Sequence, residues 1–214
     1  LILYGDVPLV KINELKKLIK IGEKGLSILT FNKINPTGYG RIVRGRKGVE
    51  AIVEEKDCSD AQKEITEVNT GIMVADTKYL INWLSLISNI NSQKEYYLTD
   101  IVALAKKDNI EINTIEADSE ITISGVNSKI ELAKMERAIQ LKKANTLMEQ
   151  GVTLLDPSRT DIRGHLDCGK DVVIDVGCIF EGKVKIGKNV TIGAYSILND
   201  CEILNDSIIK PYSH

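Results

Sequence analysis

The 214-residue sequence has no excess of basic residues, few cysteines and no long apolar run. Its 28 Lys and Arg against 30 Asp and Glu leave a formal net charge of −2, which argues against a nucleic-acid partner. No apolar stretch approaches the roughly 20 residues of a membrane span, and no signal peptide is evident. Because 43% of the residues are hydrophobic and 27% are charged, the chain is expected to be globular, with one or two domains and no membrane partner.

The four cysteines exclude the usual cysteine-based sites. Cys58, Cys168, Cys178 and Cys201 form no CxxC pair and no Cys/His metal pattern, and they are too sparse for a disulfide scaffold. Reduced thiols are the simpler interpretation. We therefore expect a cytoplasmic protein.

The first stretch, LILYGDVPL, predicts a strand that stops abruptly. An apolar run without alternation is typical of a strand buried on both faces, as at the centre of a parallel sheet. Gly5 lets a ligand approach the backbone, and Asp6 places a carboxylate at the carboxyl end of the strand, where open α/β sheets bind ligands. A lone carboxylate there suits Mg²⁺, although a simple turn explains Gly5 and Asp6 about equally well.

Both ends of the sequence fall inside structural elements. The chain opens within this strand on Leu1 rather than Met, and it stops at His214 within a repeat. A central strand needs partners on both sides, and repeats of this kind need further coils and a cap. We therefore expect an internal piece of a longer protein.

The next 120 residues alternate between helix and strand patterns. A helix follows residue 13, and apolar strands are expected at 26–31 and 67–75. The β-α-β order at the start favours parallel strands. Residues 41–44 and 49–54 predict a hairpin through the Gly45–Gly48 connection. This pattern indicates an α/β domain.

Polar residues near these strands are individually weak site candidates. The loop 35–42 has glycines on both sides of a tyrosine and could lie against a flat ligand, and Arg41 could meet a phosphate or a carboxylate. Glu54 and Lys56 would share a strand face if the strand continues, with Glu54 on sugar hydroxyls and Lys56 on phosphate. A solvated strand end is the commoner outcome. Asn69 lies beside an apolar run, and a buried amide there needs partners.

The longest helix is predicted between residues 128 and 150. Ser128 and Glu131 form a capping box at its start, and Gly151 is a left-handed cap at its end. Asn127, immediately before it, is by itself a turn residue. An apolar side is expected from Ile130, Ala133, Leu141, Ala144 and Leu147. The length of the helix suits a strut between domains.

From residue 172 the sequence repeats every six residues. Aliphatic or aromatic residues recur at Ile174, Phe180, Ile186, Ile192, Leu198 and Leu204, and small or apolar residues at Cys178, Val184, Val190 and Ser196. A hexapeptide repeat is the signature of a parallel β-helix, in which one aliphatic residue per short face points into a narrow core. The repeat does not give the handedness of the coil, and the general rule for parallel crossovers is right-handed.

Six segments followed by these repeats resemble one known family. The segments are, in order, LILYGDVPL, NPTGYGRI, IVEEKD, EVNTGI, EYYLTD and SGVN. Together they resemble the bacterial bifunctional N-acetylglucosamine-1-phosphate uridyltransferase / glucosamine-1-phosphate N-acetyltransferase family. The match covers essentially the whole chain, and Ser128 and Lys129 depart from the expected pattern without touching a ligand position.

The resemblance implies two partial domains and a linker. Residues 1–127 would be the later part of a Rossmann-like nucleotidyltransferase (uridyltransferase) domain, 128–151 a long linker helix, and 152–214 the first coils of a left-handed parallel β-helix that trimerises. A Gly-rich loop with basic residues would precede Leu1. The acetyltransferase histidine and the acetyl-CoA contacts would follow His214, so this piece alone is expected to be inactive.

The resemblance also implies a function. The full-length enzyme would transfer a uridylyl group from UTP to N-acetylglucosamine 1-phosphate, giving UDP-N-acetylglucosamine for peptidoglycan and lipopolysaccharide synthesis. It would use acetyl-CoA in its second reaction. Asp6 and Asn127 resemble the two protein ligands of Mg²⁺.

Further residues resemble contacts to the bound substrate. Tyr4 and Gly5 resemble contacts to the nucleotide sugar. The contacts to the N-acetylglucosamine moiety correspond to Gly40, Glu54 and Asn69, with Lys56, Tyr97 and Thr99 as supporting candidates.

Two alternatives remain open. Another sugar-1-phosphate nucleotidyltransferase with a hexapeptide tail would use glucose or mannose 1-phosphate instead. A non-catalytic trimerisation subunit would use the repeats alone, and retention of both Asp6 and Asn127 argues against it.

Overall fold

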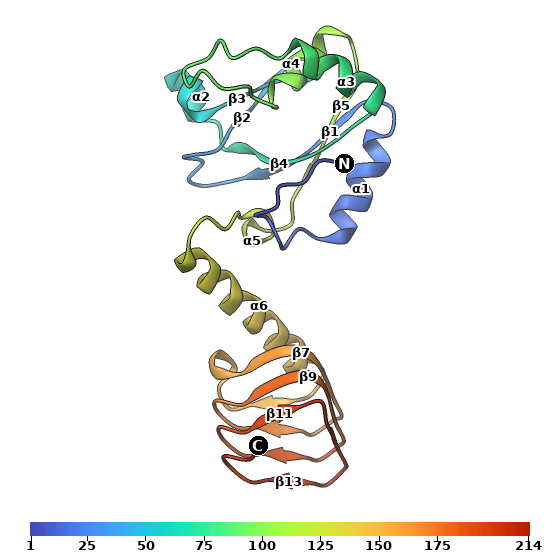
Figure 1. Cartoon of the computed structure of the whole chain (residues 1–214), viewed down its shortest axis with the longest axis vertical. Coiled ribbons are helices and arrows are strands. Elements are labelled where there is room, and N and C mark those ends of the chain that lie inside the picture. The colour runs from blue at the N-terminus through green and yellow to red at the C-terminus, as the bar shows by residue number, and fades with distance from the viewer. The chain divides into compact units, whose positions relative to one another are not determined.

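A computed structural model describes all 214 residues, which form two compact units, 1–127 and 128–214. The first unit is an α/β domain, and the second is a helix followed by a parallel β-solenoid (Figure 1). None of the helices combines the length and the apolar character that a membrane span requires. All four cysteines are free, and burial raises the pKa of the Cys168 thiol to about 12.

A mixed five-stranded sheet forms the centre of the first unit, with the strand order β3-β2-β4-β1-β5. The strands are β1 (Leu26–Asn32), β2 (Arg41–Gly45), β3 (Gly48–Val53), β4 (Glu67–Ala75) and β5 (Ile112–Glu116). Only β1 and β5 pair in parallel, whereas β1 and β2 each pair antiparallel with β4, and β2 with β3. The predicted hairpin is confirmed. The parallel pairing expected from the β-α-β order at the start is not seen, because β1 pairs antiparallel with β4 on one side and parallel with β5 on the other.

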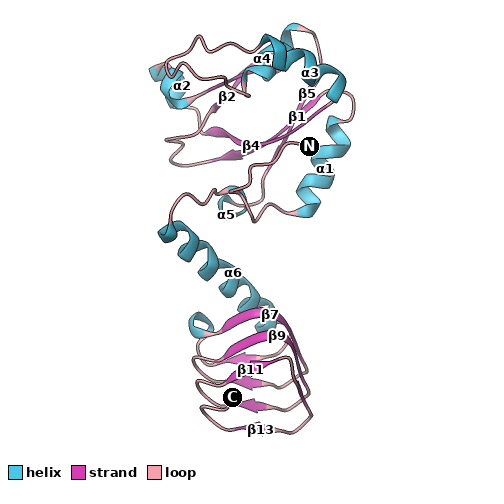
Figure 2. Cartoon of the chain, in the orientation of Figure 1, coloured by secondary structure: helices cyan, strands magenta, loops and turns pink.

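Helices cover both faces of this sheet (Figure 2). They are α1 (Ile12–Gly22), α2 (Asp60–Lys63), α3 (Thr77–Leu86), α4 (Asp100–Lys107) and α5 (Glu120–Ile123), with a 3₁₀ turn η1 (Glu55–Asp57). On one face Trp83 of α3 packs with Ile28 of β1. On the other face Leu18 of α1 packs with Leu29, the next residue of β1. The alternation along β1 therefore divides the core into two layers.

The predicted buried strand at the N-terminus is wrong. Ile2 forms only an isolated antiparallel bridge with Met73, through N–O distances of 2.7 and 3.2 Å. Leu1 and Leu3 are 52% and 47% exposed. The backbone N–H of Val7 donates to the Tyr4 carbonyl at 3.3 Å and closes a turn around Gly5 and Asp6. The extended segment therefore ends before it can form a full ladder.

The second unit stacks short parallel strands into successive coils (Figure 2). The strands are β6 (Thr153–Leu154), β7 (Asp161–Cys168), β8 (Val173–Ile174), β9 (Ile179–Ile186), β10 (Thr191–Ile192), β11 (Ile197–Asn199), β12 (Glu202–Ile203) and β13 (Ile208–Ile209). Most partners lie 18 residues apart, as in Phe180 with Leu198, whereas Leu154 of β6 pairs with Ile174 at a spacing of 20. Ile174, Phe180, Ile186, Ile192 and Leu198 are buried, which confirms the hexapeptide prediction at these positions.

The repeat loses one residue in the last coil. Lys185 pairs with Glu202 and Ile186 with Ile203, a spacing of 17 rather than 18. Ile203 therefore packs against the core, and Leu204 is 72% exposed. The prediction that Leu204 points inward is wrong because one position is missing between Asp200 and Glu202.

The long helix α6 (Lys129–Glu149) begins and ends as predicted. The Ser128 side chain accepts a hydrogen bond from the Glu131 N–H at 3.1 Å, and Gly151 has φ +96°. Its expected apolar side is only partly correct. Ala144 and Leu147 pack into the solenoid core, whereas Ile130, Ala133 and Leu141 are exposed.

Candidate functional site

The first unit contains a cleft of about 310 Å³ beside its sheet. Four segments line it: the N-terminal turn, the loop before β2, the middle of β4, and the end of α5 with the segment that follows it. The residue after β3 also lines the cleft. The lining residues are Tyr4, Asp6, Val7, Gly38, Tyr39, Gly40, Glu54, Asn69, Thr70, Gly71, Ile123, Gly125 and Asn127. Segments more than 100 residues apart in the sequence therefore meet at one cavity.

Asp6 and Asn127 flank the same glycine. A Cβ atom on Gly125 would lie 2.9 Å from Asp6 Oδ2 and 3.8 Å from Asn127 Nδ2. The Val126 N–H donates to the Asp6 carbonyl at 2.9 Å and ties the two segments together. A carboxylate and an amide are thus brought to one wall of the cleft. Carboxylate and amide oxygens are ligands that suit Mg²⁺, which usually takes one or two protein oxygens and keeps water and phosphate in its other positions.

A bulge in β4 makes room for Tyr4. The pairing of β1 with β4 shifts between Ile28 and Thr30, and Gly71 in the bulge has φ +81°. A Cβ atom on Gly71 would lie only 2.2 Å from the Tyr4 ring, so no other residue fits there without moving the ring. Burial raises the pKa of the Tyr4 hydroxyl, and the carboxylates of Glu54 and Asp6 add to this effect.

Side chains in the bulge of β4 form hydrogen bonds with backbone groups in and beside the bulge. Thr70 Oγ1 donates to the Leu29 carbonyl at 2.7 Å and accepts from the Ile72 N–H at 3.3 Å. Asn69 Oδ1 accepts from the Gly71 N–H at 3.0 Å. This bond fixes the orientation of the Asn69 amide, and its Nδ2 remains a donor on the wall of the cleft.

Glu54, another lining residue, is held between Thr99 and Gly40. Thr99 Oγ1 donates to Glu54 Oε1 at 2.8 Å. A Cβ atom on Gly40 would come within 3.2 Å of the Glu54 carboxylate, so this glycine keeps the approach open. The Gly40 carbonyl accepts from the Asn69 N–H at 2.8 Å. Glu54, Gly40 and Asn69 therefore form one connected group.

Four of the predicted site residues do not line the cleft. Gly5 is exposed in the N-terminal turn, and Thr99 acts only through Glu54. Lys56 donates to Gln93 Oε1 at 2.6 Å, because β3 ends at Val53 and the 3₁₀ turn η1 carries Lys56 away from the face of Glu54. Tyr97 lies in the same outer group, and its hydroxyl accepts from Gln93 Nε2 at 2.9 Å.

Sequence reasoning missed several lining residues. Val7, Thr70, Gly71, Ile123 and Gly125 were not expected in a site. Gly71 carried a usable signal, since an isolated glycine within an apolar strand indicates a bulge or a close approach. Ile123 and Val7 are buried apolar residues whose sequence context gave no such signal.

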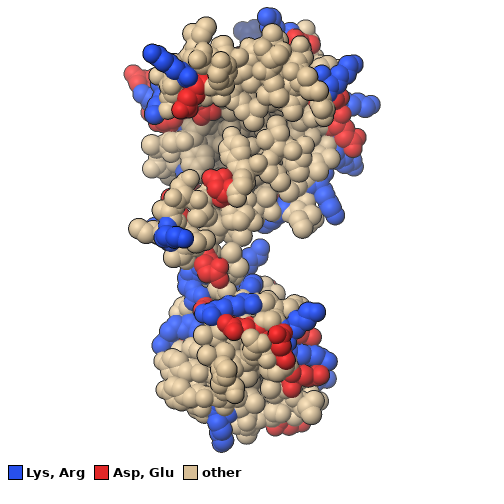
Figure 3. All heavy atoms as spheres, viewed as in Figure 1, with Lys and Arg blue, Asp and Glu red and all other residues tan.

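The charged residues that line the cleft are all acidic. Asp6 and Glu54 are its only charged lining residues, and no Lys or Arg lines it. On the face of the molecule in Figure 3, basic and acidic side chains are interspersed and form no continuous basic patch. An anionic ligand in this cleft would need positive charge from elsewhere, and a cation between Asp6 and Asn127 could supply part of it.

The fold and the repeat place the chain in a class: an α/β domain followed by a hexapeptide-repeat solenoid. Residues 168–200 match the model of the family described as bacterial transferase hexapeptide (six repeats). Along its entire length the chain is similar to proteins named bifunctional protein GlmU. It is 52% identical over 216 residues to that of Nitrosospira multiformis, covering 100% of this chain and 47% of the relative.

Other relatives of the same name give the same result. The chain is 52% identical to the protein of Janthinobacterium sp. over 215 residues, covering 100% of this chain and 48% of the relative. For Chromobacterium violaceum the identity is 46%, with 100% and 47% coverage. The resemblance seen in the sequence is thereby confirmed, and the chain spans about half the length of the curated relatives that it matches.

Proposed function

We propose that this chain forms part of a Mg²⁺-dependent enzyme that transfers a uridylyl group from UTP to N-acetylglucosamine 1-phosphate. The observation that supports this proposal is the meeting of Asp6, Asn127, Glu54 and Asn69 in one cleft. The similarity to bifunctional GlmU proteins supports the same reading.

Asp6 and Asn127 would hold the metal ion. Their side chains supply a carboxylate and an amide oxygen from one wall of the cleft, and this donor set fits Mg²⁺. Bound there, Mg²⁺ would neutralise negative charge on the phosphate oxygens. The 2.9 Å bond between Val126 N–H and the Asp6 carbonyl keeps both ligands in register.

Glu54, Gly40 and Asn69 would hold the amino sugar. Glu54 can accept a hydrogen bond from a sugar hydroxyl, and Asn69 Nδ2 can donate to a carbonyl such as that of the N-acetyl group. Gly40 lets the ring approach the backbone. An oxygen of the sugar 1-phosphate would then attack the α-phosphorus of UTP in line; the new P–O bond forms as the bond to pyrophosphate breaks. The work of the protein residues is to align these groups.

The second activity and the assembly are also proposals for the intact protein. The solenoid would form a homotrimer, and acetyl transfer from acetyl-CoA to glucosamine 1-phosphate would use residues outside this chain. The hexapeptide match at 168–200 supports a transferase of this kind.

The test is Asp6→Ala in the intact protein. We expect uridylyl transfer to fall by about two orders of magnitude or more, because the metal loses its only carboxylate ligand, while acetyl transfer stays near the wild-type rate. An equal loss of both activities would contradict the assigned role. Asp118→Asn is a matched control, since Asp118 pairs with Lys11 at 2.6 Å and does not line the cleft.

A substrate panel separates the proposed enzyme from its relatives. Turnover with glucose or mannose 1-phosphate in preference to N-acetylglucosamine 1-phosphate would indicate another sugar nucleotidyltransferase. Absence of any Mg²⁺-dependent binding of sugar nucleotide would favour a trimerisation subunit.

A further inference from the structure

Arg41, the first residue of β2, is a buried cation beside the cleft. It is 1% exposed, and its Nη2 atom lies 2.7 Å from Glu55 Oε2. Its Nη1 donates to the Tyr39 carbonyl. Its Nε is the only buried side-chain nitrogen or oxygen of the structure without a hydrogen-bond partner. Burying a guanidinium costs several kcal/mol, so packing alone does not explain a cation at this position.

Glu55 links Arg41 to the backbone of the loop. The same Oε2 atom accepts from the Gly38 N–H at 3.3 Å, and Gly38 has φ +86°. Arg41 thus holds the Tyr39 carbonyl directly and the Gly38 amide through Glu55. The hydrogen bond from Arg41 lowers the pKa of the Glu55 carboxyl, with a further lowering from Gly38. The carboxylate is therefore ionised at neutral pH, and the pair would be lost only as the pH falls through that lowered pKa.

Gly40, at the far end of this loop, contacts both Asn69 and Glu54, the residues proposed to hold the amino sugar. The Gly40 carbonyl accepts from the Asn69 N–H at 2.8 Å, and Gly40 lies against the Glu54 carboxylate. All three residues of the loop line the cleft. A shift of the loop would therefore move the surface on which an amino sugar rests.

We propose that Arg41 and Glu55 are positioning residues that fix the Gly38–Gly40 loop for binding of the amino-sugar phosphate. The nature of the ligand rests on the proposed function, whereas the fixing of the loop does not. A guanidinium is needed because its rigid fork reaches a carbonyl and a carboxylate at once. A lysine presents one compact ammonium and would keep at most one of these contacts in the same geometry.

The experiment compares Arg41→Lys and Glu55→Gln with Arg44→Lys in the intact protein. Arg44 is a matched control on the same strand: it forms two 2.6 Å bonds to Glu67 and does not line the cleft. Two quantities are measured: hydrogen exchange of the Gly38 and Gly40 amides, and steady-state kinetics with N-acetylglucosamine 1-phosphate. We expect Arg41→Lys to raise KM about tenfold with kcat changed by less than about threefold, and to speed loop exchange.

The controls decide the outcome. Arg44→Lys should change neither quantity. Unchanged loop exchange in Arg41→Lys would overturn the proposal, and so would faster exchange with an unchanged KM. If Arg41→Lys does not fold, Glu55→Gln gives the same test, because it keeps the shape and removes the charge. If the wild-type protein turns over no sugar nucleotide, the proposed function fails, and exchange still decides whether the pair fixes the loop.

Discussion

The two units of this chain differ in the regularity of their backbone. In the solenoid, most strand residues pair with the residue 18 positions away, and the departures from this spacing, between β6 and β8 and after Asp200, leave the fold intact. In the α/β unit, irregular backbone lines the cleft: the bulge of β4 at Gly71, and the loop before β2 with its left-handed Gly38, which the buried Arg41 holds. Regular repetition stabilises the solenoid, whereas local irregularity shapes the candidate site.

Among the irregular positions of the α/β unit, Gly71 is where we expect a single substitution to have the largest effect on stability and binding. Gly71→Ala places a Cβ at φ +81° and 2.2 Å from the Tyr4 ring, so Tyr4 must leave its place in the cleft. We expect a loss of about 2 kcal/mol or more in the free energy of unfolding, and about a tenfold or larger rise in KM for the nucleotide sugar, assayed in the reverse reaction with pyrophosphate. Chemical denaturation and steady-state kinetics measure these two effects.

Gly48→Ala is the control for this change. Gly48 also has a left-handed φ, +103°, but no atom lies within 4 Å of an added Cβ. It should cost about 1–2 kcal/mol of stability from backbone strain alone, with KM unchanged. Equal effects of both variants on KM would show that the contact between Gly71 and Tyr4 has no role in the cleft.

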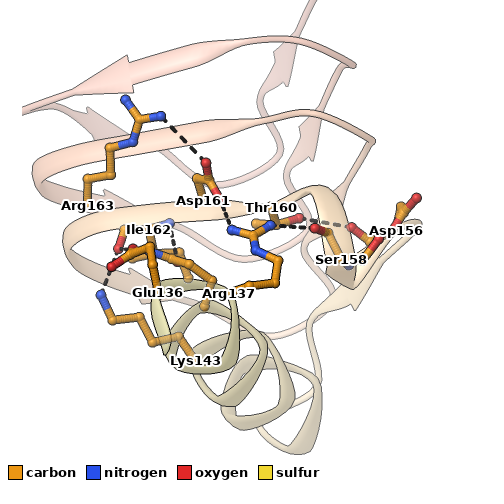
Figure 4. Close-up of polar contacts among 10 residues, drawn as sticks. Glu136, Arg137, Lys143, Asp156, Ser158, Thr160, Asp161, Ile162 and Arg163 are labelled. Atoms are coloured by element: carbon orange, nitrogen blue, oxygen red, sulfur yellow. Dashed lines mark hydrogen bonds and ion pairs between the residues drawn. The ribbon is translucent and has the colours of Figure 1, made fainter. Parts of the chain in front are cut away.

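The solenoid unit has its own irregular feature, where side chains of α6 contact the first long strand, β7 (Figure 4). The Gln140 side chain accepts from the Ile162 N–H at 2.7 Å and donates to the Ile162 carbonyl at 3.2 Å. Lys143 donates to the same carbonyl at 2.7 Å, and Arg137 bonds to Asp161. The buried glutamine thus pairs with the strand backbone much as a neighbouring strand would, and it covers an otherwise open edge.

Gln140→Ala tests whether the solenoid depends on this contact. The Ile162 N–H would lose its partner in a buried place, so we expect a loss of about 1–2 kcal/mol in unfolding free energy. Gln150→Ala, at the exposed end of the same helix, should change stability by less than about 0.5 kcal/mol. The measurement is denaturant unfolding followed by circular dichroism. Equal small effects in both variants would show that the repeats need no contact from α6.

The same contrast explains what the sequence could predict. The solenoid core could be predicted because one apolar position per hexapeptide points inward. Five of the six predicted core residues are buried. The exception, Leu204, could not be foreseen, since Ile203 and Leu204 are both apolar and a missing residue between Asp200 and Glu202 leaves that pattern unchanged.

The candidate site was harder to predict from short stretches of sequence. Asp6, Glu54, Asn69 and Asn127 each had an ordinary structural explanation, and their order along the chain in a family-like pattern brought them together as candidates. The error at Lys56 arose because a strand was extended past its true end into the turn η1. The burial of Arg41 against Glu55 depends on tertiary packing, and the sequence offered only the general alternative of a phosphate or a carboxylate.

The smallest expected effect concerns Asp156, which begins the 3₁₀ turn η2 (Pro157–Arg159) between two solenoid strands. Its carboxylate accepts from the Ser158 hydroxyl at 2.6 Å and from Arg159 Nε at 2.7 Å, and these bonds lower its pKa from 3.8 to about 2. A carboxyl with a lowered folded-state pKa stabilises the protein above its unfolded pKa, and this contribution disappears as the pH falls through the folded value.

Asp156→Asn should therefore lower the Tm at pH 7 and have progressively less effect between about pH 4 and pH 2. Because the Ser158 hydroxyl is the largest cause of the pKa shift, Ser158→Ala should reduce this pH dependence more than Arg159→Gln does. A Tm difference that stays constant from pH 7 to pH 2 would show that the capping charge does not stabilise the turn. In that case no charged cap would stabilise this turn of the solenoid, and the contrast with the Gly38–Gly40 loop of the α/β unit, which Arg41 and Glu55 hold, would become sharper.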